Sequence, residues 1–257
     1  MIKGKENKNM KKHTKKSIRI SLIKIIIAII LLLGISIILY TGSIIIKAKK
    51  QTPEIIQNAL NSKKIKLDLK DLSSEQIKIL LMVEDPNFYN HKGIDFKTPG
   101  AGLTTITQGL VKMLYFKHYK PGIINKIKLC LLARYTLNPS LSKNEQLKLF
   151  INLVYLGKAN GKPVYGFFDA AKYYYGKSVS ELSRDEYISI VAMIIAPKTF
   201  NIQANPEANK NRVECIKKMI SGEYKPKGLM DLYYGGKTYR KPRSGIKKIL
   251  SKIVWGY

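Results

Sequence analysis

The acidic residue best placed for chemistry in this sequence is Glu84. It ends an apolar run whose members recur at helical spacing, Ile77, Leu80, Leu81 and Val83. A carboxylate at the end of an apolar helix is partly removed from water, which raises its pKa and makes it a better proton acceptor near neutral pH. Glu84 is therefore the candidate general base. The alternative is a helix that ends at Pro86 with a solvated Glu84 and Asp85, because acidic residues are common at helix ends.

The chain carries a large positive charge. Its 257 residues have a formal net charge of +29, and residues 1–50 contain twelve Lys or Arg against one Glu. The residues that follow are strongly basic as well. Nucleic acid, anionic lipid and phosphorylated substrates are the partners that such a surface attracts.

Residues 25–46 help to decide which of these partners the chain has. They contain no charged side chain and are mostly Ile and Leu, and at about 1.5 Å per residue they can cross a hydrocarbon core of roughly 30 Å. The sequence predicts a transmembrane helix over residues 21–46. Residues 1–20 are predicted to be a disordered basic tail, held in the cytoplasm near anionic lipid. The rest of the chain would then be extracytoplasmic at the cell membrane, which argues against nucleic acid as a partner.

A cleaved signal peptide is the alternative for this apolar segment. The run is longer than the apolar region of a typical signal peptide, and no small-x-small cleavage site follows Ile46. An uncleaved, single-pass anchor is therefore the prediction.

Helix signals dominate the remaining residues. Capping-box spacing occurs at three places, Ser73 with Gln76, Ser142 with Glu145, and Ser183 with Glu186. With apolar periodicity and Gly or Pro at the ends, these signals predict helices over 53–61, 73–84, 105–117, 123–137, 142–155, 166–175, 183–195 and 205–221. Thr52 would cap the first of these, residues 63–69 could form a short strand, and no hairpin is predicted. The predicted class is all-α, with one domain over residues 51–222.

Residues 223–257 form a basic tail rich in aromatic side chains. Within it, residues 244–257 place apolar side chains on one helical face and lysines on the other. That pattern is typical of a helix lying in a membrane interface. A helix docked on its own domain is the alternative.

The two cysteines, Cys130 and Cys215, have no metal-ligand spacing. They are predicted to be buried free thiols. The alternative, which the sequence does not decide, is that they form an extracytoplasmic disulfide.

Five segments resemble one known family, in the family's order along the chain. Glu84-Asp85-x-x-Phe88-x-x-His91-x-Gly93 matches every specified position of E-D-x-x-F-x-x-H-x-G, the first motif of the family 51 glycosyltransferases, the peptidoglycan transglycosylases. Residues 104–112 are similar to the second motif, S-T-I-T-Q-Q-L-V-K, and residues 125–128 to the start of the third, R-K-x-x-E. The likeness continues through residues 141–152 and 170–177.

The resemblance implies a mostly helical, lysozyme-like domain that polymerises lipid II, a disaccharide-peptide on a polyprenyl pyrophosphate. Glu84 would take the proton of the acceptor sugar's 4-hydroxyl as that oxygen attacks and inverts the donor's anomeric carbon. The substrate-binding residues implied are Asp85, Thr105, Thr107, Gln108, Lys112 and Lys126, with the two lysines neutralising the pyrophosphate. Four further residues of the motifs are predicted to be structural, namely Phe88, His91, Gly93 and Asn152. Other cell-wall synthesis proteins would be partners.

Four positions depart from the family's motifs. Asn125 replaces an arginine and Leu129 a glutamate of the third motif, Gly109 replaces a glutamine of the second, and Lys148 a glutamate of the fourth. The segment between Gly93 and Thr104 is also short for the family. Leucine can neither bind a metal nor orient a pyrophosphate, so turnover is weakened or another group, such as Asp85, takes over. No cofactor is assigned, and a role for a divalent cation stays open.

Two other functions remain open. A non-catalytic partner of cell-wall synthesis that binds lipid II or glycan would explain Leu129. A lysozyme-like hydrolase would need only Glu84, as a general acid. The lysines expected to face phosphate argue against hydrolysis, because a finished glycan has no pyrophosphate to neutralise.

Overall fold

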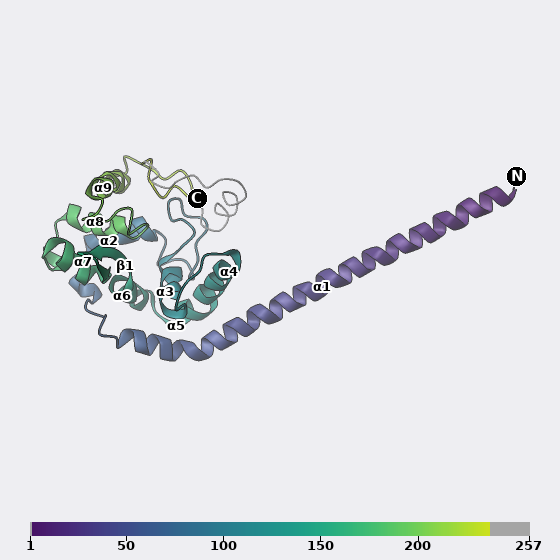
Figure 1. Cartoon of the computed structure of the whole chain (residues 1–257), viewed down its shortest axis with the longest axis horizontal. Coiled ribbons are helices and arrows are strands. Elements are labelled where there is room, and N and C mark those ends of the chain that lie inside the picture. The colour runs from purple at the N-terminus through teal and green to yellow at the C-terminus, as the bar shows by residue number, and fades with distance from the viewer. Residues whose placement is uncertain (1, 237–257) are drawn as a thin grey trace. The chain divides into compact units, whose positions relative to one another are not determined.

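The computed structural model describes residues 2–236 of the chain, with side chains from Lys24 onward. It divides into two compact units, Met1–Lys47 and Ala48–Tyr257. The predicted interfacial helix over 244–257 lies outside the described residues. Figure 1 shows the elements and the labels used below.

The first unit consists of the larger part of one long helix, α1 (Ile2–Leu60). Its segment from Lys24 has a mean hydropathy of 2.7 over its most apolar window, and none of that window is covered by protein. An apolar helix with its side chains uncovered suits a lipid environment. The predicted apolar N-terminal helix is confirmed, and it is the one helix in the described part of the chain that is long and apolar enough to span a membrane.

Two predictions about α1 were wrong. Residues 2–20 continue the helix instead of being disordered, because lysine favours helix and elongation from an existing helix needs no new nucleus. Thr52 does not cap a second helix, since α1 passes through Pro53 to Leu60. The Thr52 hydroxyl instead donates to the carbonyl oxygen of Ala48 at 2.7 Å and shares a 2.7 Å hydrogen bond with the hydroxyl of Tyr115.

The second unit is built from helices that begin at the predicted caps. All three predicted capping boxes are present, and each satisfies backbone N–H groups that have no partner in the first turn of a helix. The main helices are α2 (Ser74–Glu84), α3 (Ile106–Tyr115), α4 (Ile123–Leu132), α6 (Lys143–Leu153), α7 (Gly166–Tyr175), α8 (Arg184–Met193) and α9 (Pro206–Ser221). The short helical segments are η1 (Leu69–Asp71), η2 (Ala133–Leu137), α5 (Asn138–Ser140) and η3 (Val179–Glu181).

The core is organised around α8. Its residues from Tyr187 to Met193 are all buried, and it packs against α2, α7 and α9. Figure 1 shows α7, α8 and α9 together at one side of this unit, with α3, α4 and α5 at the other. Helix α2, which carries Glu84 at its carboxyl end, packs against both α8 and α9.

The structure contains one hairpin that the sequence reading missed. Strands β1 (Tyr155–Ala159) and β2 (Lys162–Tyr165) pair in an antiparallel ladder. The turn between them is Asn160-Gly161, with φ angles of 49° and 78°. Asn-Gly is the sequence most favoured in two-residue hairpin turns, so the signal was present in the sequence. The helical class is unaffected, because these are the only two strands in the described residues.

The strand predicted as an option over residues 63–69 does not form. The side-chain oxygen of Asn152 accepts hydrogen bonds from the backbone N–H groups of Lys66 and Leu67, at 2.8 and 2.9 Å. The Asn152 amide also donates to the carbonyl oxygen of Leu67 at 2.9 Å. A side chain therefore satisfies the backbone groups that a neighbouring strand would have used.

Candidate active site

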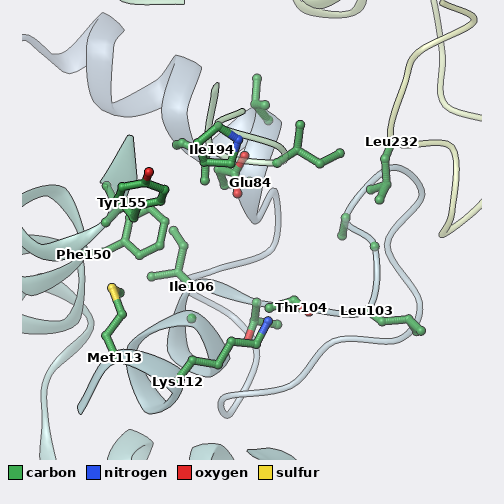
Figure 2. A pocket seen from close by; sticks show the side chains of 18 of the residues that line it. Glu84, Leu103, Thr104, Ile106, Lys112, Met113, Phe150, Tyr155, Ile194 and Leu232 are labelled. Carbon is green, nitrogen blue, oxygen red and sulfur yellow. The ribbon is translucent and has the colours of Figure 1, made fainter. Parts of the chain in front are cut away.

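A pocket of about 380 Å³ opens at the carboxyl end of α2. Its walls come from α2, the loop 101–105, α3, α6, β1, the end of α8, α9 and the residues after α9. Figure 2 shows Glu84 on one side of the pocket and Lys112 on the other, with Ile106 between them. The candidate base Glu84 and the cation Lys112, which the sequence assigned to the same chemistry, thus line one pocket.

Glu84 is the last residue of α2 and is half-buried at the wall of the pocket. Among the described residues none donates a hydrogen bond to its carboxylate. Burial raises the pKa of Glu84 to about 7, with the positive charge of Arg212 opposing that rise and the negative charge of Asp85 adding to it. The alternative interpretation, in which Glu84 and Asp85 are a solvated pair at the helix end, is therefore wrong. Glu84 can take up a proton near neutral pH.

Asp85 points away from the pocket, into the domain. Its side chain is fully buried and lies 2.9 Å from Nε2 of His91. It also accepts a 2.9 Å hydrogen bond from the backbone N–H of Ile106, at the start of α3. Asp85 does not line the pocket, so a direct contact with substrate, as the resemblance implied, has no support in the geometry. Its contacts join the end of α2 to the beginning of α3.

Three residues that the resemblance implied to bind substrate are buried and hydrogen-bonded within the domain. Thr105 and Gln108 form a capping box at the start of α3, and the Gln108 amide donates to the Cys130 sulfur at 3.1 Å. The Thr107 hydroxyl donates to Oε1 of Gln146 at 2.7 Å. Thr105 lines the pocket, whereas Thr107 and Gln108 do not. The geometry supports a role for them in positioning α3.

Lys112 and Lys126 differ in their relation to the pocket. Lys112 lines it, and Figure 2 shows its ammonium group directed toward Thr104. Burial, together with the nearby positive charge of Lys126, lowers the pKa of Lys112 to about 8. The Lys126 ammonium instead donates to the carbonyl oxygen of Leu103 and, at 3.3 Å, to the hydroxyl of Thr104. Lys126 therefore holds the loop at the rim and adds positive potential behind it.

Arg212 is a pocket residue that the sequence reading missed. It lies on α9, is 5% exposed, and donates through Nε to the carbonyl oxygen of Ala192 at 3.2 Å. Its guanidinium group also lies over the rings of Phe200, Tyr233 and Tyr234, at 5.2 to 5.6 Å. In the sequence Arg212 is one of several basic residues on α9, so no local pattern distinguishes it from the exposed ones.

The departures from the family's motifs have separate structural outcomes. Leu129 is fully buried in the core, and Lys148 forms a 2.6 Å ion pair with Asp68. Gly109 lines the pocket, where a Cβ atom would come 3.3 Å from the ring of Phe150. Within the described part of the chain no three His, Cys, Asp or Glu side chains are grouped to hold a metal ion.

The cysteines are unpaired in the structure. Cys130 and Cys215 are both free thiols, and both are half-buried instead of buried. Cys130 lies behind the rim of the pocket, where burial raises the pKa of its thiol.

Phe88, His91 and Gly93, which were predicted to be structural, pack or form hydrogen bonds within the domain. Phe88 is 1% exposed, and Nδ1 of His91 accepts a 3.0 Å hydrogen bond from the backbone N–H of Gly93. Gly93 has a φ of +91°, and a Cβ atom there would lie 2.6 Å from the carbonyl oxygen of Ala133. The loop that follows Glu84 therefore requires glycine at position 93.

Replacing Gly93 with alanine is expected to destabilise the domain. The positive φ and the close approach to backbone together should cost about 2 kcal/mol or more. The measurement is the denaturation midpoint of the full chain in detergent, compared with Gly228→Ala, where a Cβ atom would meet nothing within 4 Å. Equal midpoints for the two variants would show that the loop relaxes at no cost.

A model of the family described as Transglycosylase matches residues 51–220. The chain belongs to this transglycosylase family, and the predicted mostly helical, lysozyme-like fold of its domain is confirmed. Penicillin-binding protein 1B of Buchnera aphidicola subsp. Baizongia pistaciae is 31% identical over 187 residues, covering 67% of this chain and 25% of that protein. Penicillin-binding protein 1F of Bacillus subtilis is 27% identical, covering 83% of this chain and 33% of that protein.

Penicillin-binding protein 1B of Escherichia coli is 29% identical over 185 residues, covering 65% of this chain and 21% of that protein. The chain thus spans between 21% and 33% of the length of these three relatives. The likeness concerns the transglycosylase portion of much longer proteins.

Proposed function

We propose that this chain is a membrane-anchored peptidoglycan glycosyltransferase that polymerises lipid II-type polyprenyl-pyrophosphate disaccharides into glycan strands. The observation that carries the proposal is that one pocket is lined both by Glu84, with a pKa near neutral, and by the cation Lys112. This transfer requires two groups. One is a carboxylate that accepts the proton of the acceptor hydroxyl, and the other is a cation that neutralises the departing phosphate.

The proposed step begins with the 4-hydroxyl of the acceptor sugar near Glu84. The oxygen attacks the anomeric carbon of the donor as the hydroxyl proton passes to the Glu84 carboxylate. The bond from the anomeric carbon to the pyrophosphate oxygen breaks, and the pyrophosphate leaves with the bonding electrons. Attack from the face opposite the leaving group inverts the anomeric centre.

Lys112 is proposed to neutralise the pyrophosphate as it leaves. A cation fixed in a partly dry pocket stabilises charge that develops there better than one in open solvent. Lys126 contributes through its field and through the loop residues Leu103 and Thr104 that it binds. Asp85, Thr105, Thr107 and Gln108 are proposed to hold the end of α2 and the start of α3 in the arrangement that places Glu84 and Lys112 in one pocket.

The membrane helix fits a substrate that is itself held in a bilayer. We propose a cytoplasmic N-terminus and an extracytoplasmic catalytic domain, because the heavier cluster of lysines precedes the apolar segment. The basic segments would contact anionic lipid, and other proteins of cell-wall synthesis would be its partners. Labelling of cysteines introduced on either side of the apolar segment in intact cells would test the orientation.

The rate of polymerisation is expected to follow a bell-shaped pH profile. Glu84 must be ionised to act as a base, so the rate should fall as the pH drops below its pKa of about 7. Lys112 must be protonated to meet the phosphate, so the rate should also fall as the pH rises above its pKa of about 8. The measurement is kcat/KM with labelled lipid II from roughly pH 5 to pH 10. A flat profile would contradict both assignments.

A non-catalytic role in binding lipid II is the second candidate, and the burial of Leu129 favours it. The position carries no acid, and its side chain lies in the core, not in the pocket. The purified full chain with labelled lipid II separates the candidates. Polymer supports transfer, tight binding without polymer supports the binding role, and shortening of preformed glycan strands supports a hydrolase.

A further inference from the structure

The residues after α9 pack against the pocket although they lie beyond the residues that match the family. We call residues 224–236 the C-terminal strap. The family match ends at residue 220, yet Leu232 and Tyr234 of the strap line the pocket. Figure 2 shows Leu232 facing the loop that carries Leu103 and Thr104.

The strap is bonded to the loop at the rim of the pocket through backbone groups. The N–H of Gly100 donates to the carbonyl oxygen of Gly228 at 2.9 Å, and the N–H of Gly102 donates to that of Leu229 at 2.8 Å. Side chains of the strap also touch this loop closely, since a Cβ atom on Gly102 would lie 2.8 Å from Leu232. The loop and the strap therefore form one layer.

The strap is also bonded to the helices that surround Glu84. The hydroxyl of Tyr234, a residue that is 3% exposed, donates to the carbonyl oxygen of Val83 at 3.1 Å. Nη1 of Arg212 donates to the carbonyl oxygen of Leu232 at 3.0 Å. One bond thus fixes the residue before the candidate base, and the other ties the strap to α9.

We infer that the C-terminal strap is a wall of the active site that positions Glu84 and keeps water from it. The strap covers the loop between Gly93 and Thr104 and supplies two residues of the pocket wall. Leu232 and Tyr234 are then positioning residues of this chain that act through Val83 and the loop. The catalytic consequence rests on the proposed function, whereas the shielding of Glu84 does not.

Two substitutions test the strap without removing it. Leu232→Ala opens the wall but leaves the backbone bonds, and Tyr234→Phe removes only the hydroxyl that holds Val83. Lys225→Ala is the matched control, because Lys225 is an exposed residue of the strap. Thermal unfolding of each full-chain variant in detergent establishes that it is folded.

The first measurement does not require turnover. It is the rate at which a water-soluble carbodiimide modifies Glu84, read by peptide mass spectrometry, with exposed Glu75 on the same helix as internal reference. Leu232→Ala is expected to accelerate modification of Glu84 and leave that of Glu75 unchanged. An unchanged Glu84 rate would overturn the inference, whether or not the wild type makes polymer.

The second measurement is the pH profile of polymerisation. Both variants are expected to lower kcat/KM by about tenfold to a hundredfold, because small displacements of a catalytic group are costly. In Leu232→Ala the acid limb should also move to lower pH, since water reaching Glu84 weakens the effect of burial. The charges that face Glu84, Arg212 and Asp85, are the same in both variants, and Tyr234 is kept in Leu232→Ala.

The outcomes distinguish failure of the inference from failure of the proposed function. If the wild type makes no polymer, the proposed function fails and the carbodiimide result decides the strap alone. If the wild type polymerises and both variants match Lys225→Ala in rate and acid limb, the strap is only C-terminal packing.

Discussion

Glu84→Gln is expected to lower the rate of polymerisation by about 10² to 10⁴-fold, the usual contribution of a positioned general base. Glutamine keeps the shape of the side chain but cannot accept the proton of the acceptor hydroxyl. Because Glu84 forms no hydrogen bond with the described residues, the substitution leaves none of them without a partner. The fold and the binding of lipid II should therefore be retained.

The experiment measures polymer from labelled lipid II and, separately, binding of the same substrate. Glu75→Gln is the matched control, since Glu75 lies on the same helix and pairs at the surface with Arg184. That control should polymerise like the wild type. If Glu84→Gln retained full activity, Glu84 would not be the base, and the proposed mechanism would be wrong.

Lys112→Met is expected to have the second largest effect, a fall in kcat of about 10² to 10³-fold, as when one charge-stabilising donor is removed from an active site. Methionine is close in length and suits a half-buried position, so the loss should come from the charge. Lys78→Met, an exposed lysine on α2, is the matched control.

Lys112→Arg provides a sharper test of the same role. A guanidinium group stays protonated throughout the accessible pH range, whereas the pKa of Lys112 is about 8. If Lys112 causes the alkaline limb of the pH profile, the arginine variant should lose that limb while it keeps the acid limb of Glu84. An unchanged alkaline limb would assign it to another group.

The helices of the domain were largely predictable from local sequence. The capping boxes at Ser73, Ser142 and Ser183 each act within one turn, so spacing alone reveals them. Gly176, with a φ of +67° at the end of α7, is likewise a local signal. The Asn160-Gly161 turn of the hairpin is a local signal of the same kind, since its two residues alone specify the turn.

The roles of individual site residues were less predictable. Thr105, Thr107 and Gln108 were expected to bind substrate, yet a capping box and a buried hydrogen bond to Gln146 use their polar atoms. Polar side chains in such a motif can bind substrate or form hydrogen bonds within the domain. Which of the two they do depends on which face of α3 is covered by other elements. That is a property of the packed domain and not of the motif.

Three features of this protein follow from its sequence alone: an apolar N-terminal helix, a helical domain and an acid at the end of an apolar run. These features arise from periodicity, caps and hydropathy, which act between residues that are near one another in the chain. The packing of the domain, in contrast, places Lys112 and Glu84 in the walls of one pocket, brings the charge of Arg212 near Glu84, and lays the C-terminal strap over the loop at the rim. Those relations join residues more than a hundred positions apart in two of the three cases, and they depend on how α2, α8 and α9 pack.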